Sequence, residues 1–286
     1  MSIVPLLPLH FMKFRNPEID RLFDYLSTKS REAYKDPFLI SNVVLSKQET
    51  CGKVLENYLA NTTPKEITLL FSVKKLVLYF VKNLAGFFLY ILSTLAHRLS
   101  GQKFHLQETG ECLILDTYFQ VGDILNRGRM EDTYFPGLSK VLIKRNKTHV
   151  YVPRLIGSNQ FFDLFRAFRI LKKINAPVLT EFQMVRFVDY LDAARFLFLY
   201  PFSFFRFIKK LGSSYEDKIL RYGLWQALDG VILGGDMRYL LGKRLASMKN
   251  DGIKCLSWYE NVVAEKNFYR GLRSYSKKPE IIGMQS

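Results

Sequence analysis

Six short apolar runs in the sequence end in polar residues of types that transfer protons or bind hydroxyl and phosphate groups. The candidates at these positions are Asp116, Arg154, Glu181, Asp236, Glu260 and Gln285. If the runs are parallel strands, all six side chains would reach one edge of the sheet, where open α/β sheets bind their ligands. Some polar residue must follow any strand, so a helix cap or a salt-bridge partner is the alternative interpretation of each carboxylate.

The elements that would position these groups are apolar, β-rich runs that alternate with helical patterns. The runs are Cys112–Leu115, His149–Val152, Pro177–Leu179, Gly230–Leu233, Ile253–Leu256 and Glu280–Ile282, and helical patterns lie at 161–174 and 238–249. Near-continuous apolar strands that alternate with helices indicate a parallel sheet covered on both faces. We therefore predict an α/β fold, a Rossmann-like doubly wound domain.

Three parts of the chain differ in character. We expect an N-terminal α/β segment at 1–62, with a helix from Pro17 and a strand at 38–45, as part of the same domain. An inserted apolar and basic helical segment is expected at 63–106, and the Rossmann-like domain at 107–286.

The sequence around Gly234 and Gly235 is the nearest candidate for a phosphate-binding turn. Two glycines between a strand and a helix would bring the backbone and its free amides close to an anion. The segment matches neither the dinucleotide-binding fingerprint nor the P-loop, and Asp236 at the expected helix start would repel an anion. A structural turn is favoured, and the two glycines and Arg238 are kept as candidate substrate-binding residues.

Composition excludes several classes of protein. With 48% hydrophobic residues among 286, the chain has ample apolar material for a core and is not disordered as a whole. Three widely spaced cysteines without a CxxC pair, and four unpaired histidines, argue against a zinc site or a disulfide framework, so we expect no metal. The apolar N-terminus has no basic region before it and contains prolines, so we expect a cytoplasmic protein.

Two apolar segments suggest contact with a membrane. The first runs from Glu66 to Leu99, and its longest uncharged run, Asn83–Ala96, has 14 residues. A helix of that length rises about 21 Å, less than the ~30 Å hydrocarbon core of a bilayer. We expect a helix in the headgroup region, with a buried core helix as the alternative and a spanning helix not favoured.

The second segment, at 193–211, has seven aromatic residues between Phe196 and Phe207, bordered by basic ones. Rings beside cations suit a membrane–water boundary, although ordinary core packing is the alternative. Pro201 should end or kink a helix at Tyr200. The expected membrane-contact residues of the two segments are Lys74, Lys75, Phe87, Phe88, Phe204, Phe205, Arg206, Lys209 and Lys210.

The formal net charge of +16 points to a polyanionic partner. Basic residues gather at 138–173, with nine against Asp163 alone, and again at 238–278. No signature of a common nucleic-acid-binding module accompanies them, so nucleic acid is the third choice of partner. The apolar and aromatic segments favour an anionic membrane surface, where each basic residue contributes about 1 kcal/mol.

Parts of the sequence resemble a known family. The segments are EDTYFPGLSKVLIKRNKTHVYVPR (131–154), TEFQ (180–183) and SWYENVVAEKNFYRGLR (257–273), followed by EIIGMQS (280–286). They resemble bacterial surface-polysaccharide biosynthesis proteins, which are glycosyltransferases of the GT-B type with two Rossmann-like domains. The resemblance covers roughly residues 112–286, and its most specific part is the Trp-Tyr-Glu-Asn segment at 258–261.

The resemblance implies the acceptor-binding half of such an enzyme, acting on a lipid-linked glycan of capsule, O-antigen or similar polysaccharide at the inner face of the cell membrane. Sugar transfer needs a general base beside the acceptor hydroxyl, and Glu260, Asp116 and Glu181 are the candidates. The candidate substrate-binding residues are Arg154, Tyr118, Tyr259, Gly234, Gly235, Arg238 and Gln285.

The resemblance also implies that a second domain holds the sugar-nucleotide donor, so we expect no cofactor bound by this chain. The sequence stops where the link to that domain would be expected. A separate donor-binding chain or a truncated, inactive product would account for this. The competing hypothesis is a non-catalytic, membrane-peripheral scaffold protein, which needs only the basic and aromatic segments.

Overall fold

The computed structural model describes residues 17–33, 35–36, 44, 50–62, 66–103, 112–130, 132–174, 176–228, 232–248, 253–260, 262–274 and 279–284. Gln285 and nearly all of the strand expected at 38–45 lie outside these residues. The helices are α1 (Pro17–Ala33), α2 (Thr50–Leu59), α3 (Leu69–Ser100), α4 (Val121–Arg127), α5 (Leu138–Lys144), α6 (Phe161–Lys173), α7 (Glu181–Met184), α8 (Phe187–Lys209), α9 (Tyr215–Ala227), α10 (Leu233–Met248) and α11 (Val263–Arg273).

A four-stranded, all-parallel sheet forms the centre of one region of the molecule. Its strands are β1 (Cys112–Gln120), β2 (His149–Ile156), β3 (Ile253–Trp258) and β4 (Glu280–Met284), in the order β2-β1-β3-β4. The chain moves from β1 to β2 on one side and then crosses to β3 on the other side of β1. The direction of winding therefore changes between β1 and β3, and ligands of open α/β sheets bind at the carboxyl ends of such a strand pair.

Four of the six predicted strands are confirmed, and the other two are wrong in the residues described. Val178 forms only an isolated parallel bridge to Tyr151. Leu233 begins α10, and Ile232 lies outside any strand. Both runs are buried, and a short buried apolar run has the same sequence pattern in a strand and in a helix end.

Helices cover both faces of the sheet, as predicted. On one face, Leu115, Phe119 and Tyr151 pack with apolar residues of α4, α6 and the last turns of α3. On the other face, residues of β1, β2 and β3 pack with α10 and α11. Gly242 of α10 and Gly271 of α11 bring these two helices together, because a Cβ on either would lie within 2.5 Å of the partner's backbone.

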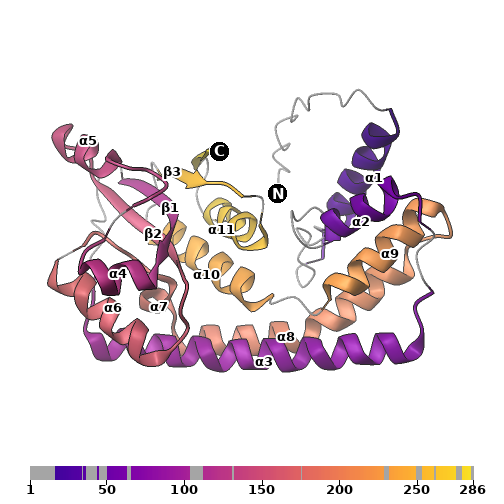
Figure 1. Cartoon of the computed structure of the whole chain (residues 1–286), viewed down its shortest axis with the longest axis horizontal. Coiled ribbons are helices and arrows are strands. Elements are labelled where there is room, and N and C mark those ends of the chain that lie inside the picture. Colours follow the sequence, from indigo (N-terminus) through magenta and orange to yellow (C-terminus); the bar gives the residue numbers. More distant parts are fainter. Residues whose placement is uncertain are drawn as a thin grey trace.

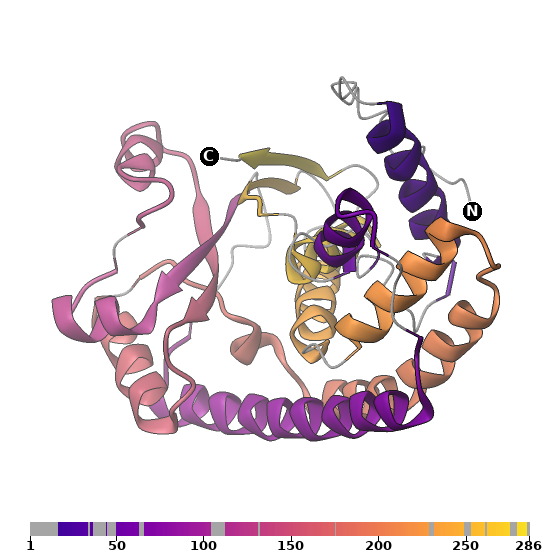
Figure 2. The same cartoon turned by 45° about the vertical axis from the view of Figure 1, so that its right-hand side comes forward.

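A second, helical region lies beside the sheet. Its core joins residues of α1, α2, α8 and α9 with the first half of α3. Figures 1 and 2 show α10 and α11 between the two regions, and α3 running beneath both. With 32 residues, α3 is about 48 Å long and connects the two ends of the molecule.

Of the two outcomes expected at Pro201, an end or a kink of the helix at Tyr200, the end is wrong, because helix α8 continues through Pro201 to Lys209. Proline has no N–H, so the carbonyl of Leu197, four residues earlier, loses its donor within the helix. Tyr79 of α3 replaces that donor, because its hydroxyl donates to the Leu197 carbonyl over 2.8 Å, at a buried position. Contact with α3 thus allows a proline inside α8 and ties the two helices together.

Candidate functional site

A buried ionic cluster lies where β1 and β3 adjoin. Arg238 of α10 donates to Asp116 in the middle of β1, and its Nη1 is 3.8 Å from the Glu181 carboxylate at the start of α7. Arg238 is 1% exposed, and its guanidinium lies 4.4 Å from the centroid of the Phe268 ring. One guanidinium therefore holds two of the three carboxylates predicted to be catalytic.

Hydroxyl groups extend this cluster across β3. Ser257 donates to the second oxygen of Asp116 over 2.7 Å, and Tyr269 of α11 donates to Ser257 over 2.5 Å. The ring of Tyr259 packs on Tyr269, with centroids 6.2 Å apart. Asp116, Glu181 and Tyr259, which come from distant parts of the sequence, are thus brought into one region. We call Asp116, Glu181, Arg238, Ser257 and Tyr269 the buried cluster.

Burial dominates the electrostatics of the buried cluster. It raises the pKa of Asp116, and the charge of Arg238 together with the hydrogen bond from Ser257 opposes that rise. Burial also raises the pKa of Tyr90 on α3, whose hydroxyl lies 3.5 Å from Glu181. Because Asp116 and Glu181 are bound to Arg238 and shielded from solvent, their arrangement suits positioning of the strands and helices better than proton transfer to a substrate.

A second cluster lies at the carboxyl edge of the sheet. Tyr118 of β1 donates to Glu265 of α11 over 2.5 Å, and Arg154 of β2 donates to the Tyr118 hydroxyl over 3.0 Å. Glu265 also accepts from the backbone N–H groups of Glu260 and Val262, at 3.0 and 3.2 Å. Burial raises the pKa of Glu265, while these donors oppose the rise.

Aromatic rings complete this edge. The ring centroid of Tyr134 lies 5.5 Å from that of Tyr118 and 4.9 Å from that of Trp258, the last residue of β3. Trp258 donates its indole N–H to Glu260 over 3.3 Å. We call Tyr118, Tyr134, Arg154, Trp258, Glu260 and Glu265 the rim cluster. Tyr134, Trp258 and Glu260 are only partly buried, so this edge presents two ring systems and a carboxylate toward solvent.

The loop that carries Tyr134 is held by a carboxylate. Asp132 accepts hydrogen bonds from the backbone N–H groups of Tyr134 and Phe135, both at 3.0 Å. Tyr134, Trp258 and Glu265 were not among the predicted site residues. All three lie within the segments 131–154 and 257–273, on which the expected resemblance rested.

The two glycines near the start of α10 do not form a phosphate-binding turn. Gly234 and Gly235 lie within the first turn of the helix, not between a strand and a helix. A Cβ on Gly235 would be 2.9 Å from Val263 and 3.0 Å from Asn267 of α11, so its missing side chain serves helix packing. Arg238, one turn later, points into the buried cluster.

Helix α3 shows an unusual distribution of polar and apolar groups. Seven of its residues are buried, and most of these are polar: Tyr79, Asn83, Ser93, Thr94, Ala96, His97 and Ser100. Its exposed large apolar residues are Leu69, Leu70, Val73, Val77, Val81, Leu84, Phe88, Leu89, Ile91, Leu92, Leu95 and Leu99. Apart from Leu89, these recur at helical spacing on the side opposite the buried residues. We call this apolar side the outward face of α3.

The buried polar side chains of α3 have specific partners. Asn83 accepts from the backbone N–H of Ile232, just before α10, over 3.0 Å. Tyr190 of α8 donates to Thr94 over 2.5 Å, and His97 is hydrogen-bonded to Gln102 at 2.6 Å. Among the described residues, α3 is the one helix long and apolar enough to cross a membrane by length and composition. A crossing would bring these polar partners into hydrocarbon, whereas lying flat leaves them inside the protein.

The membrane-contact residues predicted from the sequence separate into two groups. Phe88 lies on the outward face of α3 and is 62% exposed, and Lys74, Arg206, Lys209 and Lys210 are also exposed. The remaining residues point inward. Phe204 is 1% exposed and packs edge-to-face on Trp225, Phe205 packs on the same ring, Phe87 packs on Tyr190, and Lys75 donates to the Gln226 carbonyl.

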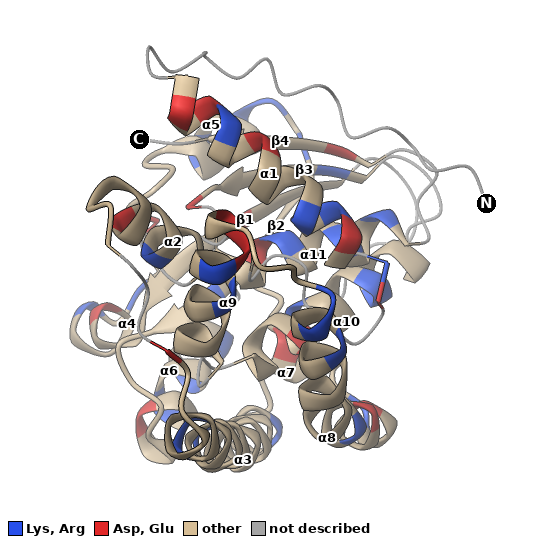
Figure 3. Ribbon diagram, turned by 90° about the vertical axis from the view of Figure 1, so that its right-hand side faces the viewer, with Lys and Arg blue, Asp and Glu red and all other residues tan. Residues whose placement is uncertain are grey.

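The outward side of α8 continues the apolar surface of α3. Its exposed large apolar residues are Phe187, Val188, Leu191, Phe198 and Phe202. Figure 3, which looks along α3, shows α3 and α8 side by side on one side of the molecule, with the sheet above them. Phe204 is a correction to the prediction, because its position on α8 faces the helical core, whereas Phe198 and Phe202 face outward.

Comparison of the chain with protein-family models, with curated proteins and with solved structures finds no match. Among the described residues, no group of three or more His, Cys, Asp or Glu side chains is placed to hold a metal ion.

Proposed function

We propose that the protein is a membrane-surface component of surface-polysaccharide biosynthesis. It acts as the acceptor-binding half of a GT-B-type glycosyltransferase on a lipid-linked glycan of capsule, O-antigen or similar polysaccharide. The observation that carries the proposal is the outward face of α3, which offers apolar side chains to a partner, while most uncharged polar side chains of the helix face the protein and Lys74, Lys82 and Arg98 are exposed. We place the protein in the cytoplasm, at the inner face of the cell membrane.

The outward face fits a bilayer in shape and charge. It extends along a helix of about 48 Å, and a large exposed apolar surface of this kind marks a site of interaction. The exposed Phe198 and Phe202 of α8 share their helix with Arg206 and Lys209, so rings can enter the acyl boundary while cations meet phosphate. Helix α3 itself contains no acidic residue, which suits an anionic surface.

The sheet supports the enzymatic part of the proposal. A parallel sheet in the order 2-1-3-4 with helices on both faces is consistent with a Rossmann-like doubly wound domain. The rim cluster lies at the carboxyl edge of β1, β2 and β3, where such domains bind ligands. The resemblance of 131–154 and 257–273 to GT-B glycosyltransferases involves the same loops.

Roles for single residues follow from their exposure. The partly exposed rings of Tyr134 and Trp258 would stack on sugar faces, and Glu260, held by the Trp258 indole at 3.3 Å, would be the general base. Arg154 and Tyr259, which are partly exposed, would bind acceptor hydroxyls or phosphate, and the buried Tyr118 would position Arg154. Asp116 and Glu181 would keep the edge in place through Arg238. The donor sugar nucleotide would be bound by a second Rossmann-like half on another polypeptide.

Sugar binding at the rim cluster can be tested without knowing the donor. Saturation-transfer NMR against a panel of soluble monosaccharides and disaccharides should detect binding by the full chain. Replacing Trp258 by Ala should abolish the signal, whereas replacing Phe162, an exposed ring on α6, should not. Equal signals from the two variants would contradict a sugar site at the rim.

In the active assembly with a donor-binding half, Glu260→Gln should lower turnover by roughly 100-fold or more, as expected for loss of a general base. Unchanged turnover would remove Glu260 from this role. Turnover by the isolated chain would contradict the need for a second half.

A non-catalytic, membrane-peripheral scaffold is the second candidate. The observation in its favour is that Asp116 and Glu181, two of the three expected bases, are occupied by Arg238. Vesicle binding without any sugar binding at the rim would favour the scaffold over the glycosyltransferase-like protein.

A further inference from the structure

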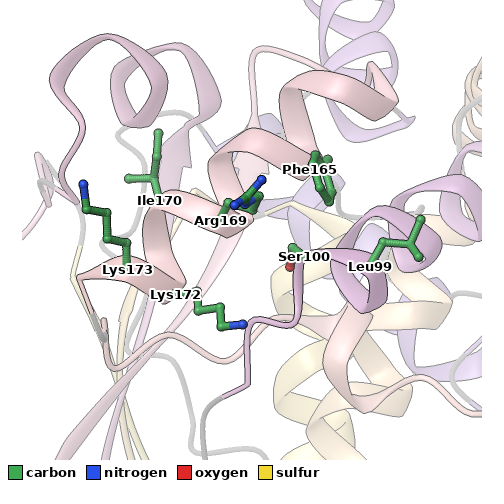
Figure 4. Close-up of a pocket in the computed structure, with 7 residues that line it drawn as sticks. All are labelled: Leu99, Ser100, Phe165, Arg169, Ile170, Lys172 and Lys173. Atoms are coloured by element: carbon green, nitrogen blue, oxygen red, sulfur yellow. The ribbon is translucent and has the colours of Figure 1, made fainter.

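A groove of about 680 Å³ opens where the end of α3 meets α6. Figure 4 shows its lining, in which α3 contributes Leu99 and Ser100, and α6 contributes Phe165, Arg169, Ile170, Lys172 and Lys173. The three basic residues recur at i, i+3 and i+4, so they share one side of α6. All three are exposed, and within the described part of the chain no carboxylate forms an ion pair with them.

Two of the cations have additional contacts that fix their place. The guanidinium of Arg169 lies 5.8 Å from the centroid of the Phe165 ring. The Lys172 ammonium lies over Gly101, the left-handed residue that ends α3, so closely that a Cβ there would be 2.9 Å away. A cation beside the carbonyl end of a helix stabilises it, so Lys172 has a structural role as well.

The groove adjoins the outward face of α3. Leu99 lines the groove and is also the last residue of that face, at 62% exposure. In Figure 1, α6 lies at the same end of the long α3 helix. When an amphipathic helix lies in the acyl boundary, groups at the edge of its apolar side are level with the lipid phosphates.

We propose that this groove binds the phosphate of an anionic lipid headgroup and so fixes one end of α3 on the membrane. The proposal rests on the membrane contact proposed above. The occupant is a bilayer lipid, because the cations adjoin an apolar surface that a soluble phosphate would leave uncovered. The outward face would supply apolar contact and the groove would supply preference for anionic lipid.

The test compares two double variants that remove the same charge. Arg169→Gln with Lys173→Gln removes two groove cations and spares Lys172, and Arg145→Gln with Lys147→Gln removes an arginine and a lysine just beyond α5. Figure 1 places α5 on the side of the molecule opposite α3, so the control charges lie away from the groove. Binding is measured by flotation with two kinds of vesicle. One is phosphatidylcholine alone, and the other contains about 30% phosphatidylglycerol, an anionic lipid.

The groove variant should bind the anionic vesicles about thirtyfold more weakly than the wild type, because each basic residue near the surface contributes about a factor of five. The α5 variant should bind like the wild type. Arg169→Lys with Lys173→Arg, which keeps both charges, should retain most of the binding. Circular dichroism of all variants should be unchanged, because the replaced side chains are exposed.

Equal losses in the groove and α5 variants would overturn the groove as a site, since they would show a response to net charge alone. Full competition by millimolar inorganic phosphate would also overturn the groove as a lipid site. So would tight binding of duplex DNA by the wild type that the groove variant loses and the α5 variant keeps. If the wild type floats with phosphatidylcholine vesicles, and the groove variant binds the anionic vesicles as tightly as the wild type does, only the groove proposal fails. If the wild type floats with neither vesicle, the proposed membrane function fails as well.

Discussion

The buried cluster and the outward face depart from the usual distribution of polar and apolar groups in opposite senses. In the buried cluster, three charged side chains lie in the interior, bound to one another. Along the outward face, eleven large apolar residues are exposed, while most uncharged polar residues of α3 are buried. Isolated exposed apolar residues are ordinary, but buried charge and a continuous apolar surface both need explanation.

The difference lies in where each region finds its partners. The charges of the buried cluster have their partners inside the chain, so the cluster explains how β1, α7 and α10 are held together. The apolar side chains of the outward face are left exposed by the described residues, and the proposed membrane contact would cover them. We therefore expect changes in the buried cluster to affect stability and changes in the outward face to affect binding.

Removing the central cation should have the largest effect. Arg238→Met leaves Asp116 and Glu181 buried without their cation, and the free energy of unfolding should fall by about 3–5 kcal/mol. Urea denaturation measures this, with Arg273→Gln, an exposed position on α11, as the control that should change little. Adding Asp116→Leu to Arg238→Met should restore part of the loss. An Arg238→Met variant as stable as the wild type would contradict the account of the buried cluster.

Substitutions on the outward face should weaken membrane binding and leave the free energy of unfolding nearly unchanged. Phe88→Glu with Leu95→Glu should weaken binding to vesicles at least about 100-fold, because burial of each such side chain in an apolar phase contributes about 1.5–3 kcal/mol. Ile143→Glu on α5, an equally exposed apolar position, is the control and should bind like the wild type. A large loss of stability in the double variant would show that this side of α3 is buried in the protein.

Asp236 has a largely buried carboxylate that forms no ion pair with the described residues, as a contrast to Asp116. Burial, with the nearby charges of Asp192 and Asp189, raises the pKa of Asp236 from 3.8 to about 7, and its Oδ2 has no hydrogen-bond partner among the described residues. The native state keeps this proton up to about pH 7, whereas the unfolded state loses it near pH 4. The contribution to stability is therefore fully present at low pH and is lost as pH rises from about 4 to 7.

Replacing Asp236 by Asn should remove this loss. At pH 8 the free energy of unfolding of the variant should exceed that of the wild type by about 2 kcal/mol, which is less than the full pKa shift would give because Asp236 is partly exposed to solvent. At pH 4 the two proteins should be nearly equally stable. Urea denaturation at the two pH values measures the difference. A gain in stability of Asp236→Asn that does not depend on pH would contradict the raised pKa.

The smallest expected effect concerns the inward side of α3. Tyr79→Phe leaves the Leu197 carbonyl buried without its donor and should lower the free energy of unfolding by about 1.5 kcal/mol. Adding Pro201→Ala to this variant should recover stability, because alanine restores the N–H that Leu197 can accept within α8. No recovery in the double variant would show that the Tyr79 hydroxyl acts in another way.

The sequence was sufficient to predict the parallel sheet, because four of its apolar runs pair as strands and helical patterns lie between them. It misplaced 177–179 and 230–233, where short buried runs lack the length that separates strand from helix. Strand β1 also continues to Gln120, so Asp116 lies in its middle and not at its end. That shift buries Asp116 and gives it Arg238 as a partner, which only the packing of α10 on the sheet determines.

The sequence also predicted that α3 is helical, but not which side of it faces outward. Its apolar residues are spread around much of the helix. Asn83 and His97 face inward because Ile232, just before α10, and Gln102 supply their partners there. Similarly, the spacing of aromatic residues in α8 did not distinguish the buried Phe204 from the exposed Phe202. Which side of a helix faces the interior depends on neighbouring elements that are distant in sequence.

The contact between the outward face and lipid is tested most directly by the depth of a single side chain. Phe88→Trp places a fluorescent ring on that face, and Ile143→Trp places one on α5 at similar exposure. With vesicles of anionic lipid brominated in the acyl chains, the added fluorescence of Phe88→Trp should be strongly quenched and that of Ile143→Trp should not. Absence of quenching in Phe88→Trp, or equal quenching in both, would contradict the proposal that α3 lies in the membrane interface.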